Sequence, residues 1–332
     1  MRAIMIETYG GPDVVRIRRD VPVPLAGPNE VQVRVAWAGI NFMDIHTRQG
    51  KYRDSRTYPI TLPCTLGMEG SGTVTALGQG VSSLRIGDRV AWCIAWGSFA
   101  EFVCIPAARA ARIPRDTTFK VAAAAMFHGC TAHYLIEDVA NLNPGSTCLV
   151  HAGSGNIGQL LIQLAKARGA TVVATASTSE KRAVAESRGA DLVLPYQNGG
   201  FAEAVRTFTK GKGVDVVFDS VGLTTLRHSL LATRTRGIVI NYGNVSGSVT
   251  DLNPIELGES GSLFLTRPRL ADHMRDAQEV QRRADAVFAA IGNHSLQIQV
   301  EGEYTMDQIA LVHDRIERRE HIGKSIVLIG DT

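Results

Sequence analysis

The sequence predicts an α/β chain in which an antiparallel, barrel-like β domain precedes a doubly wound parallel sheet. Short β-like runs separated by Gly and Pro clusters fill residues 1 to about 120, whereas strands alternate with helices from about residue 123. Closely spaced short strands are typical of a barrel or sandwich, and strand–helix alternation is typical of a parallel sheet with crossover helices.

The predicted elements follow in chain order. The first domain, residues 1–122, takes its strands from residues 30–36, 72–77, 89–93 and 99–105. The second domain, residues 123–267, has predicted helices at 122–138, 156–168, 180–188, 200–209 and 223–232, and strands at 147–151, 171–176, 191–195, 214–219, 237–242 and 262–266. The tail, residues 268–332, carries a helix at 270–291, a strand at 296–300, a helix at 306–318 and a strand at 325–329. We expect the tail to complete the sheet of the first domain.

A glycine-rich turn indicates a dinucleotide site. Residues 146–158 read as a buried strand, then a G-x-G-x-x-G turn, then the start of a helix with an apolar stripe. Gly153 is expected to permit the tight turn, Gly155 the approach of a pyrophosphate, and Gly158 the close packing of helix on strand. The helix N-terminus would then face the phosphates. The alternative is a turn without a ligand, which the agreement of strand, turn, helix and next strand disfavours.

The residues after the second strand of this unit indicate the choice of cofactor. An NAD-binding unit places an Asp or Glu there against the ribose 2′-hydroxyl, but this chain has Ser177 and then Lys181 and Arg182. Hydroxyls and cations suit a 2′-phosphate, so we expect NADPH. Alternatively, the two cations lie in the solvated first turn of a helix capped by Thr178 or Ser179, and both interpretations can hold together.

Composition bears on the partners and the cellular compartment of the chain. Its net charge of +3 comes from 35 basic and 32 acidic residues spread over 332 positions, so no nucleic-acid or membrane partner is expected. No signal-peptide core opens the chain and no apolar run approaches the ~18 residues of a membrane span, so we expect a cytoplasmic protein. Five cysteines without a C-x-x-C pair indicate buried thiols rather than disulfides or structural zinc.

Several further segments carry a resemblance to a known family, namely residues 38–44, 48–52, 66–72, 87–90, 219–222 and 242–244. With them the chain resembles, over nearly its whole length, the zinc-free quinone oxidoreductases of zeta-crystallin type in the medium-chain dehydrogenase/reductase superfamily. The resemblance implies a GroES-like β-barrel catalytic domain and a Rossmann domain. It also implies a homodimer that pairs Rossmann-domain edges across a two-fold axis.

The resemblance also implies a site without metal. The zinc-dependent branch has a Cys and a His where this chain has Asn41 and Met68, and Glu69 alone cannot hold zinc. Without a Lewis acid, hydride delivery to an electrophilic conjugated acceptor remains easy, whereas alcohol oxidation becomes hard. The expected activity is therefore direct hydride transfer from the nicotinamide C4 of NADPH to a quinone, without metal or flavin.

The family pattern implies the site residues. Asn41 and Tyr52 are expected near the nicotinamide and the acceptor oxygen, and His46 joins them as a departure from a frequent Tyr that could donate to a quinol oxyanion. His128 is a second departure, from a frequent Lys, and either histidine could instead merely pack. The expected cofactor contacts are Thr131, Gly153, Ser154, Gly155, Asn156, Ile157, Gly158, Ser177, Lys181, Arg182, Tyr196, Ser220, Tyr242, Gly243, Asn244, Leu265, Thr266 and Arg319.

Two other functions stay open at this point. An NADPH-dependent enone, enal or enoyl-thioester reductase would use the same hydride step but must then protonate the α-carbon. A weakly active NADPH-binding protein with a structural or RNA-binding role is a reuse known for such folds. The near-neutral charge balance counts against the RNA-binding alternative.

Overall fold

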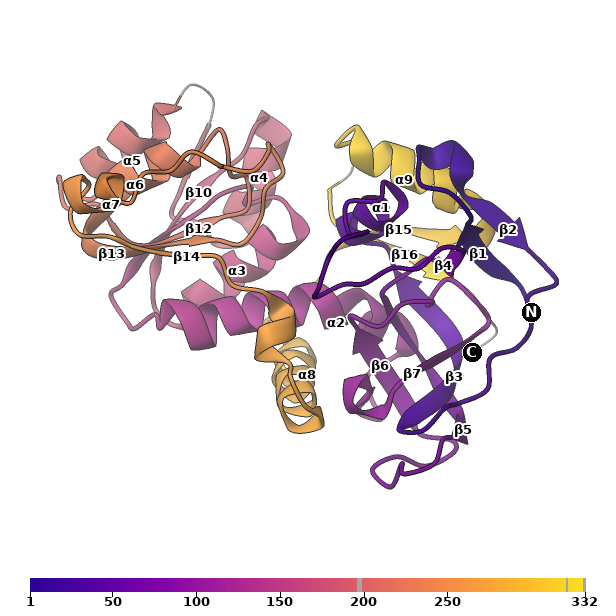
Figure 1. The fold of residues 1–332 in the computed structure, drawn as a ribbon. Helices are drawn as coiled ribbons and strands as arrows, with labels where there is room; N and C mark the ends of the chain where they lie inside the picture. Colours follow the sequence, from indigo (N-terminus) through magenta and orange to yellow (C-terminus); the bar gives the residue numbers. More distant parts are fainter. Residues whose placement is uncertain (196–198, 321, 331–332) are drawn as a thin grey trace. The chain divides into compact units, whose positions relative to one another are not determined.

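The computed structural model describes residues 1–195, 199–320 and 322–330 (Figure 1). These residues form two compact units, one of Met1–Cys130 with the tail from His273 onward, the other of Thr131–Asp272. The predicted α/β class is confirmed, with a β-rich unit and a parallel-sheet unit. The predicted domain boundaries after residues 122 and 267 remain predictions.

A parallel sheet forms the centre of the second unit. Across the sheet, its described strands are β11 (Leu192–Leu194), β10 (Thr171–Thr175), β9 (Thr147–Val150), β12 (Val214–Asp219), β13 (Thr233–Asn241) and β14 (Phe264–Thr266). Every neighbouring pair is parallel. In sequence order this is 3-2-1-4-5-6, the doubly wound arrangement that places ligands at the carboxyl ends of the strands.

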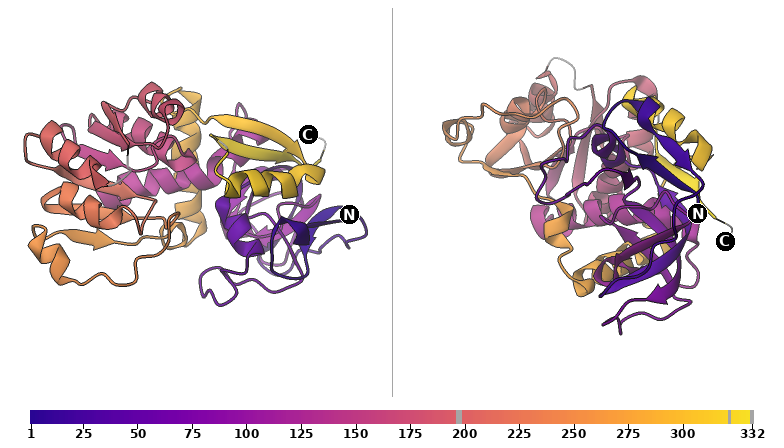
Figure 2. Two further views of the ribbon diagram at one scale, coloured as in Figure 1. Left: turned by 90° about the horizontal axis from the view of Figure 1, so that it is seen from above. Right: turned by 45° about the vertical axis from the view of Figure 1, so that its right-hand side comes forward.

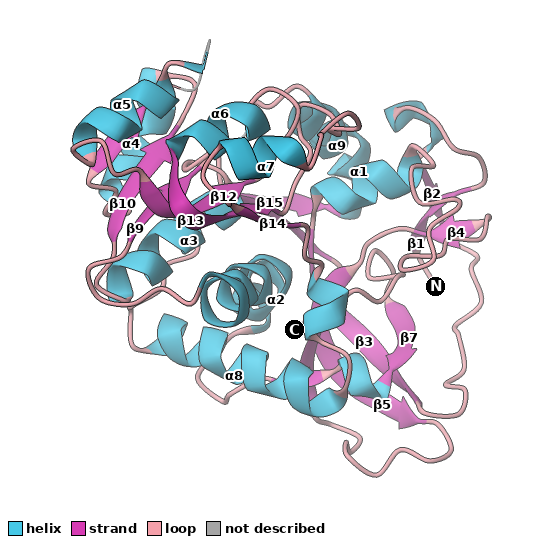
Figure 3. Ribbon diagram, turned by 60° about the vertical axis from the view of Figure 1, so that its left-hand side comes forward, coloured by secondary structure: helices cyan, strands magenta, loops and turns pink. Residues whose placement is uncertain are grey.

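Helices cover both faces of this sheet. The described helices that pack with it are α3 (Asn156–Ala167), α4 (Ser179–Ser187), α5 (Phe201–Phe208), α6 (Leu226–Ala232) and α7 (Ile255–Glu259), while α2 (Phe119–Tyr134) spans the division between the units. Figure 3 shows α5 and α6 on one face and α3 on the other. Beneath α5 and α6, Phe201 and Leu226 pack with Leu149 and Val217 of the strands in one buried cluster. Their burial holds the strand ends in place.

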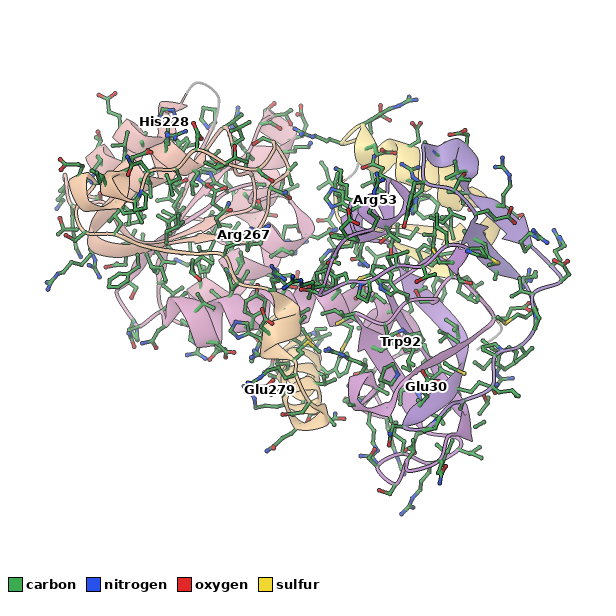
Figure 4. The ribbon with its side chains drawn as sticks, in the orientation of Figure 1. Glu30, Arg53, Trp92, His228, Arg267 and Glu279 are labelled. Atoms are coloured by element: carbon green, nitrogen blue, oxygen red, sulfur yellow. The ribbon has the colours of Figure 1, made fainter. Side chains whose placement is uncertain are left out.

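Antiparallel pairing dominates the first unit. A small sheet has the order β2 (Arg16–Arg18), β1 (Ala3–Ile6), β4 (Cys64–Thr65). The larger sheet has the order β15 (Val300–Thr305), β16 (Lys324–Leu328), β3 (Glu30–Gly39), β5 (Glu69–Leu77), β6 (Arg89–Cys93), β8 (Ala111–Arg112), with β7 (Phe102–Pro106) paired to β3. The helices α1 (Phe42–Arg48), α8 (Ala277–Gly292) and α9 (Ile309–Glu317) complete the unit. Trp92, labelled in Figure 4, is fully buried in its core.

The two ends of the chain meet in this sheet. Strand β16 of the tail pairs antiparallel with β3, with Ile326 opposite Gly39 and Leu328 opposite Trp37. Figure 2 shows the yellow tail against the N-terminal strands. This pairing brings Lys324, the first residue of β16, to the end of β3 that leads into Asn41.

Several elements differ from the prediction, among them the unpredicted helix α7, and three differences bear on the sheet of the first unit. Helix α1 was not predicted. The expected helix at 270–291 is a short 3-10 turn followed by α8, because Asp276 caps α8 by accepting a hydrogen bond from the Glu279 N–H at 2.9 Å. The expected strand at 296–300 lies instead at 300–305, because its pairing with β16 begins at Val300. Long-range pairing thus overrides the local apolar alternation.

Candidate active site

The predicted cofactor residues of the second unit meet at one edge of its sheet. In a parallel sheet the carboxyl ends of all strands lie on the same side. Four of the predicted segments lie directly at those ends: the glycine turn after β9, Ser177 after β10, Ser220 after β12, and residues 242–244 after β13. Leu265 and Thr266 close β14. The structure therefore brings these residues together as a dinucleotide site requires.

The glycine turn is shaped by close packing. A Cβ atom on Gly158 would lie 2.3 Å from the Ala152 carbonyl oxygen, so this glycine lets α3 approach the turn, as predicted. Gly153 does not serve the tight turn through a left-handed conformation, which Ala152 adopts instead with φ of 51°. A Cβ on Gly153 would instead lie 2.9 Å from the Cβ of Ala174, so it is a packing glycine. The helix N-cap, Gly155, has no side chain to cover the first-turn N–H groups, which suits a phosphate.

The segment after β10 forms the capped helix start that was one of the two interpretations, and the 2′-phosphate role of its cations remains a prediction. Thr178 caps α4, since its hydroxyl accepts a hydrogen bond from the Lys181 N–H at 3.3 Å. Lys181 and Arg182 therefore lie in the first turn of α4, both half-buried. The cap uses only a backbone N–H, so the cationic side chains remain suited to a 2′-phosphate.

Turns after β12 and β13 are packed against each other. The Asp219 carboxylate accepts hydrogen bonds from the N–H groups of Val221 and Gly222, both at 2.9 Å. A Cβ on Gly243 would lie 2.4 Å from the Ser220 carbonyl oxygen, so only glycine permits this approach. Burial raises the pKa of the Tyr242 hydroxyl, and a hydrogen bond with Ser220 partly offsets that shift.

Of the other three predicted cofactor residues, one lies outside the described residues and two belong to a helix or follow one. Tyr196 lies outside the described residues. Thr131 is buried within α2, and Arg319 is exposed beyond the end of α9, in the other unit, with φ of 61°. The roles of these residues remain predictions.

Helix α1 carries the predicted acceptor residues in the first unit. It begins after its N-cap, Asn41, whose N–H donates to Oδ2 of the Asp44 side chain at 2.7 Å. His46 lies edge-on to Phe42, with ring centroids 4.8 Å apart, and its Nδ1 is 3.4 Å from the Tyr52 hydroxyl. Burial, with a smaller contribution from Lys51, lowers the pKa of His46 to about 4. The structure therefore brings His46 and Tyr52 together and keeps the imidazole neutral at physiological pH.

A buried ammonium group holds the side chain of Asn41. Lys324 Nζ donates to Asn41 Oδ1 at 2.7 Å and to Glu69 Oε2 at 2.6 Å. The Asn41 Nδ2 group donates to Glu69 Oε2 at 2.9 Å and to the Gly39 carbonyl at 3.2 Å. Both amide hydrogens are thus used within the protein, and Asn41 is only 2% exposed. These hydrogen bonds join the start of α1 to β5 and β16, and the expected place of Asn41 near the nicotinamide and the acceptor oxygen remains a prediction.

Glu69 accepts one further hydrogen bond, from the Phe127 N–H at 2.5 Å. A Cβ on Gly39 would lie 2.3 Å from Glu69 Oε2, so only glycine at this position leaves room for the carboxylate. Lys324 was not predicted, because it opens an ordinary apolar strand and lies 283 residues from Asn41. Helix α1 did have a local signal, since Asn41 and Asp44 have the spacing of a capping box.

This cluster does not fit a tetrahedral zinc ion. The oxygen atoms of Asn41 and Glu69 already meet a cation, Lys324, which would repel a metal at the same ligands. Met68 is buried, and a thioether does not replace the imidazole of the zinc-dependent branch. Across the part of the chain that the structure describes, no three His, Cys, Asp or Glu side chains are grouped to hold a metal.

Comparisons with known proteins agree with this architecture. Two family models match, "Alcohol dehydrogenase GroES-like domain" over residues 27–115 and "Zinc-binding dehydrogenase" over residues 156–262. The chain is 34% identical to a quinone oxidoreductase of Pseudomonas aeruginosa over 328 residues, covering 98% of this chain and 99% of the relative. It is 34% identical to a 2-haloacrylate reductase of a Burkholderia species over 334 residues, covering 98% of each. The crystal structure of Escherichia coli quinone oxidoreductase complexed with NADPH superposes with a TM-score of 0.93 at 33% identity, covering 99% of this chain and 100% of the other.

Proposed function

Because this chain belongs to the zinc-free quinone oxidoreductases of the medium-chain dehydrogenase/reductase superfamily, we propose that it reduces quinones with NADPH and uses neither metal nor flavin. The observation that carries the proposal is the cluster of Asn41, Glu69 and Lys324. In it, the ammonium group of Lys324 binds the side-chain oxygen atoms that a metal ion would need as ligands. A site built this way suits acceptors that are already electrophilic, as quinones are.

The second unit would hold the cofactor. The N-terminus of α3 and the glycine turn at residues 153–158 face the pyrophosphate, and Lys181 and Arg182 pair with the 2′-phosphate. Ser220 and residues 242–244 flank the same edge of the sheet. Bound NADPH supplies a hydride, and the quinone takes up that hydride and one proton to become a quinol while NADP⁺ forms.

His46 and Tyr52 are the proposed donors to the acceptor oxygen. The pKa of His46 near 4 leaves a neutral ring, which carries one N–H to donate, and the Tyr52 hydroxyl lies 3.4 Å from its Nδ1. Asn41 acts indirectly, because its amide hydrogens are committed to Glu69 and Gly39. It sets the start of α1, and α1 carries His46.

Initial rates with four reactant pairs test the proposal. A planar ortho-quinone and a 2-alkenal are each supplied with NADPH and with NADH. We expect the highest kcat/KM for the pair of ortho-quinone and NADPH. Faster turnover of the alkenal would favour the second candidate below, and no turnover of either acceptor would remove the proposed activity.

The second candidate is reduction of a conjugated carbon–carbon double bond. It is favoured by the 34% identity to a 2-haloacrylate reductase, whose name describes such an acceptor. The same cofactor edge would serve, but the chain must also deliver a proton to the α-carbon. Trapping of deuterium from solvent at that carbon would distinguish this reaction from quinone reduction.

We also propose a homodimer in the cytoplasm. Among the described strands, β14 lies at the end of its sheet, and its Phe264 is 63% exposed, which suits pairing with a second copy. Light scattering after chromatography should give twice the monomer mass, and Phe264→Asp should give the monomer. All five cysteines lie in described residues and are unpaired, as in a reducing compartment. None of the described helices has the length and apolar character to cross a bilayer.

A further inference from the structure

A fully buried histidine lies directly beneath the glycine turn. His151 follows the last residue of β9, and both its ring nitrogens are hydrogen-bonded. Nδ1 is 2.9 Å from the Thr175 hydroxyl, and Nε2 is 2.9 Å from the Ser229 hydroxyl. The ring packs edge-on against Phe201 of α5, with centroids 4.8 Å apart. Such a buried polar residue requires an explanation, because an apolar side chain would fill the space without needing partners.

Two acceptors beside Ser229 show which group donates in each hydrogen bond of His151. The Ser229 hydroxyl has one hydrogen and lies 3.0 Å from the Asp219 carboxylate and 3.0 Å from the Thr225 carbonyl, both of which only accept. That hydrogen is therefore used, and Ser229 must accept from His151 Nε2–H. In the neutral ring Nδ1 then accepts from the Thr175 hydroxyl. Burial lowers the pKa of His151 and so keeps the ring neutral, and the hydrogen bonds of the two hydroxyl groups select this tautomer.

The partners of His151 lie at the ends of two neighbouring strands. Thr175 is the last residue of β10, and Asp219, reached through Ser229, is the last residue of β12. His151 itself leads from β9 into the left-handed Ala152 and the glycine turn. The hydrogen-bonded chain from Thr175 to Asp219 thus joins the carboxyl ends of β10, β9 and β12.

We propose that His151 is a positioning residue for the dinucleotide, which fixes the spacing between three binding segments. These segments are the glycine turn after β9, the 2′-phosphate segment that begins at Ser177 after β10, and the turn at Ser220 after β12. Asp219 also holds the turn after β12, since its carboxylate accepts hydrogen bonds from the N–H groups of Val221 and Gly222. The identity of the dinucleotide as NADPH rests on the proposed function.

Calorimetric titration of NADPH into His151→Leu tests this inference. Lost polar contacts of this kind are worth about one to two powers of ten in binding, so we expect the Kd to rise about ten- to a hundredfold. His151→Gln should recover most of the affinity, because its carboxamide has an NH2 group that donates and an oxygen that accepts. His313→Leu is the matched control: His313 is equally buried, lies in the other unit, and its ring nitrogens have no hydrogen-bond partner among the described residues. Its Kd should stay within about twofold of wild type.

The outcomes separate a positioning role from a merely structural one. Wild-type affinity in His151→Leu, an equal loss in His313→Leu, or no recovery in His151→Gln would each overturn the inference. If His151→Leu does not fold, Thr175→Val and Ser229→Ala interrupt the same chain at either side of the retained histidine, and unchanged Kd values in both would overturn it. Failure of the wild-type protein itself to bind NADPH would instead refute the proposed function.

Discussion

The ammonium nitrogen of Lys324 lies 2.6 Å from Oε2 of Glu69, and the two side chains are 1% and 0% exposed. Removing one partner of such a buried ion pair destabilises the folded protein, because the other charge is then left away from water without a counter-ion. Here the pair also joins β16 of the tail to β5 of the larger sheet.

Lys324→Met should lower the free energy of unfolding by about 3–5 kcal/mol, since Glu69 would stay buried without a counter-ion. The double variant Lys324→Met/Glu69→Gln removes both charges and should recover much of that loss. Urea unfolding of the wild type, both single variants and the double variant measures the coupling. Additive losses would show that the two charges do not stabilise each other.

The double change Lys181→Ala/Arg182→Ala should weaken NADPH far more than NADH, because only NADPH carries the 2′-phosphate. One charge-assisted hydrogen bond is worth roughly 1.5–3 kcal/mol, which corresponds to about a ten- to hundredfold rise in Kd. Fluorescence titration with each cofactor measures the ratio. Equal losses for both cofactors would mean that these cations do not contact the phosphate.

His46→Phe should lower kcat for a quinone about ten- to a hundredfold while the Kd for NADPH stays nearly constant, since a donor to the acceptor oxygen acts in the transition state. His46→Tyr restores a donor and should recover much of the rate. Because the pKa of His46 is about 4, the wild-type rate should show no inflection from this group between pH 6 and 8. An unchanged kcat in His46→Phe would make His46 a packing residue.

His313 should make the fold sensitive to acid. Burial, assisted by the charge of Arg48, lowers its pKa to about 3 from the ordinary value of 6.5. Between these values the unfolded chain binds a proton that the folded chain does not, so stability falls as the pH falls, by up to ~1.4 kcal/mol per unit.

In His313→Leu the unfolding free energy should therefore decline less steeply than in wild type between pH 6.5 and 4. Urea unfolding at several pH values gives the two slopes. Asp44 acts in the opposite sense, because burial raises its pKa to about 8 and the folded chain keeps a proton that the unfolded chain loses. The difference between wild type and variant isolates His313, and parallel curves would contradict the prediction.

Chelation should leave quinone reduction unchanged, because the ammonium of Lys324 already meets the oxygen atoms of Asn41 and Glu69. Elemental analysis of the purified protein should find less than stoichiometric zinc. Activity that is lost with a chelator and restored by added zinc would overturn the zinc-free assignment.

Local patterns predicted the cofactor half of the site more completely than the acceptor half. The strand before the glycine turn, the turn and α3 are contiguous, so their periodicity and glycine spacing suffice to locate the dinucleotide edge. Which residue takes the left-handed conformation depends on packing, however, and the glycine pattern did not reveal that it is Ala152. The proposed acceptor half includes Asn41, and the pairing of β16 with β3 brings Lys324 to that residue. The residues next to Lys324 in the sequence give no indication that its ammonium group is hydrogen-bonded to Asn41.

The closure of the larger sheet by the tail has a consequence for how the enzyme is made. A ribosome releases residues 131–272 well before β16, so the dinucleotide-binding sheet can form on a nascent chain. The Asn41 cluster cannot, since Glu69 requires an ammonium group that is synthesised 255 residues later. A chain interrupted before Lys324 would bind the reductant without an ordered place for the oxidant. During synthesis, the cluster of Asn41, Glu69 and Lys324 therefore forms later than the dinucleotide-binding sheet can.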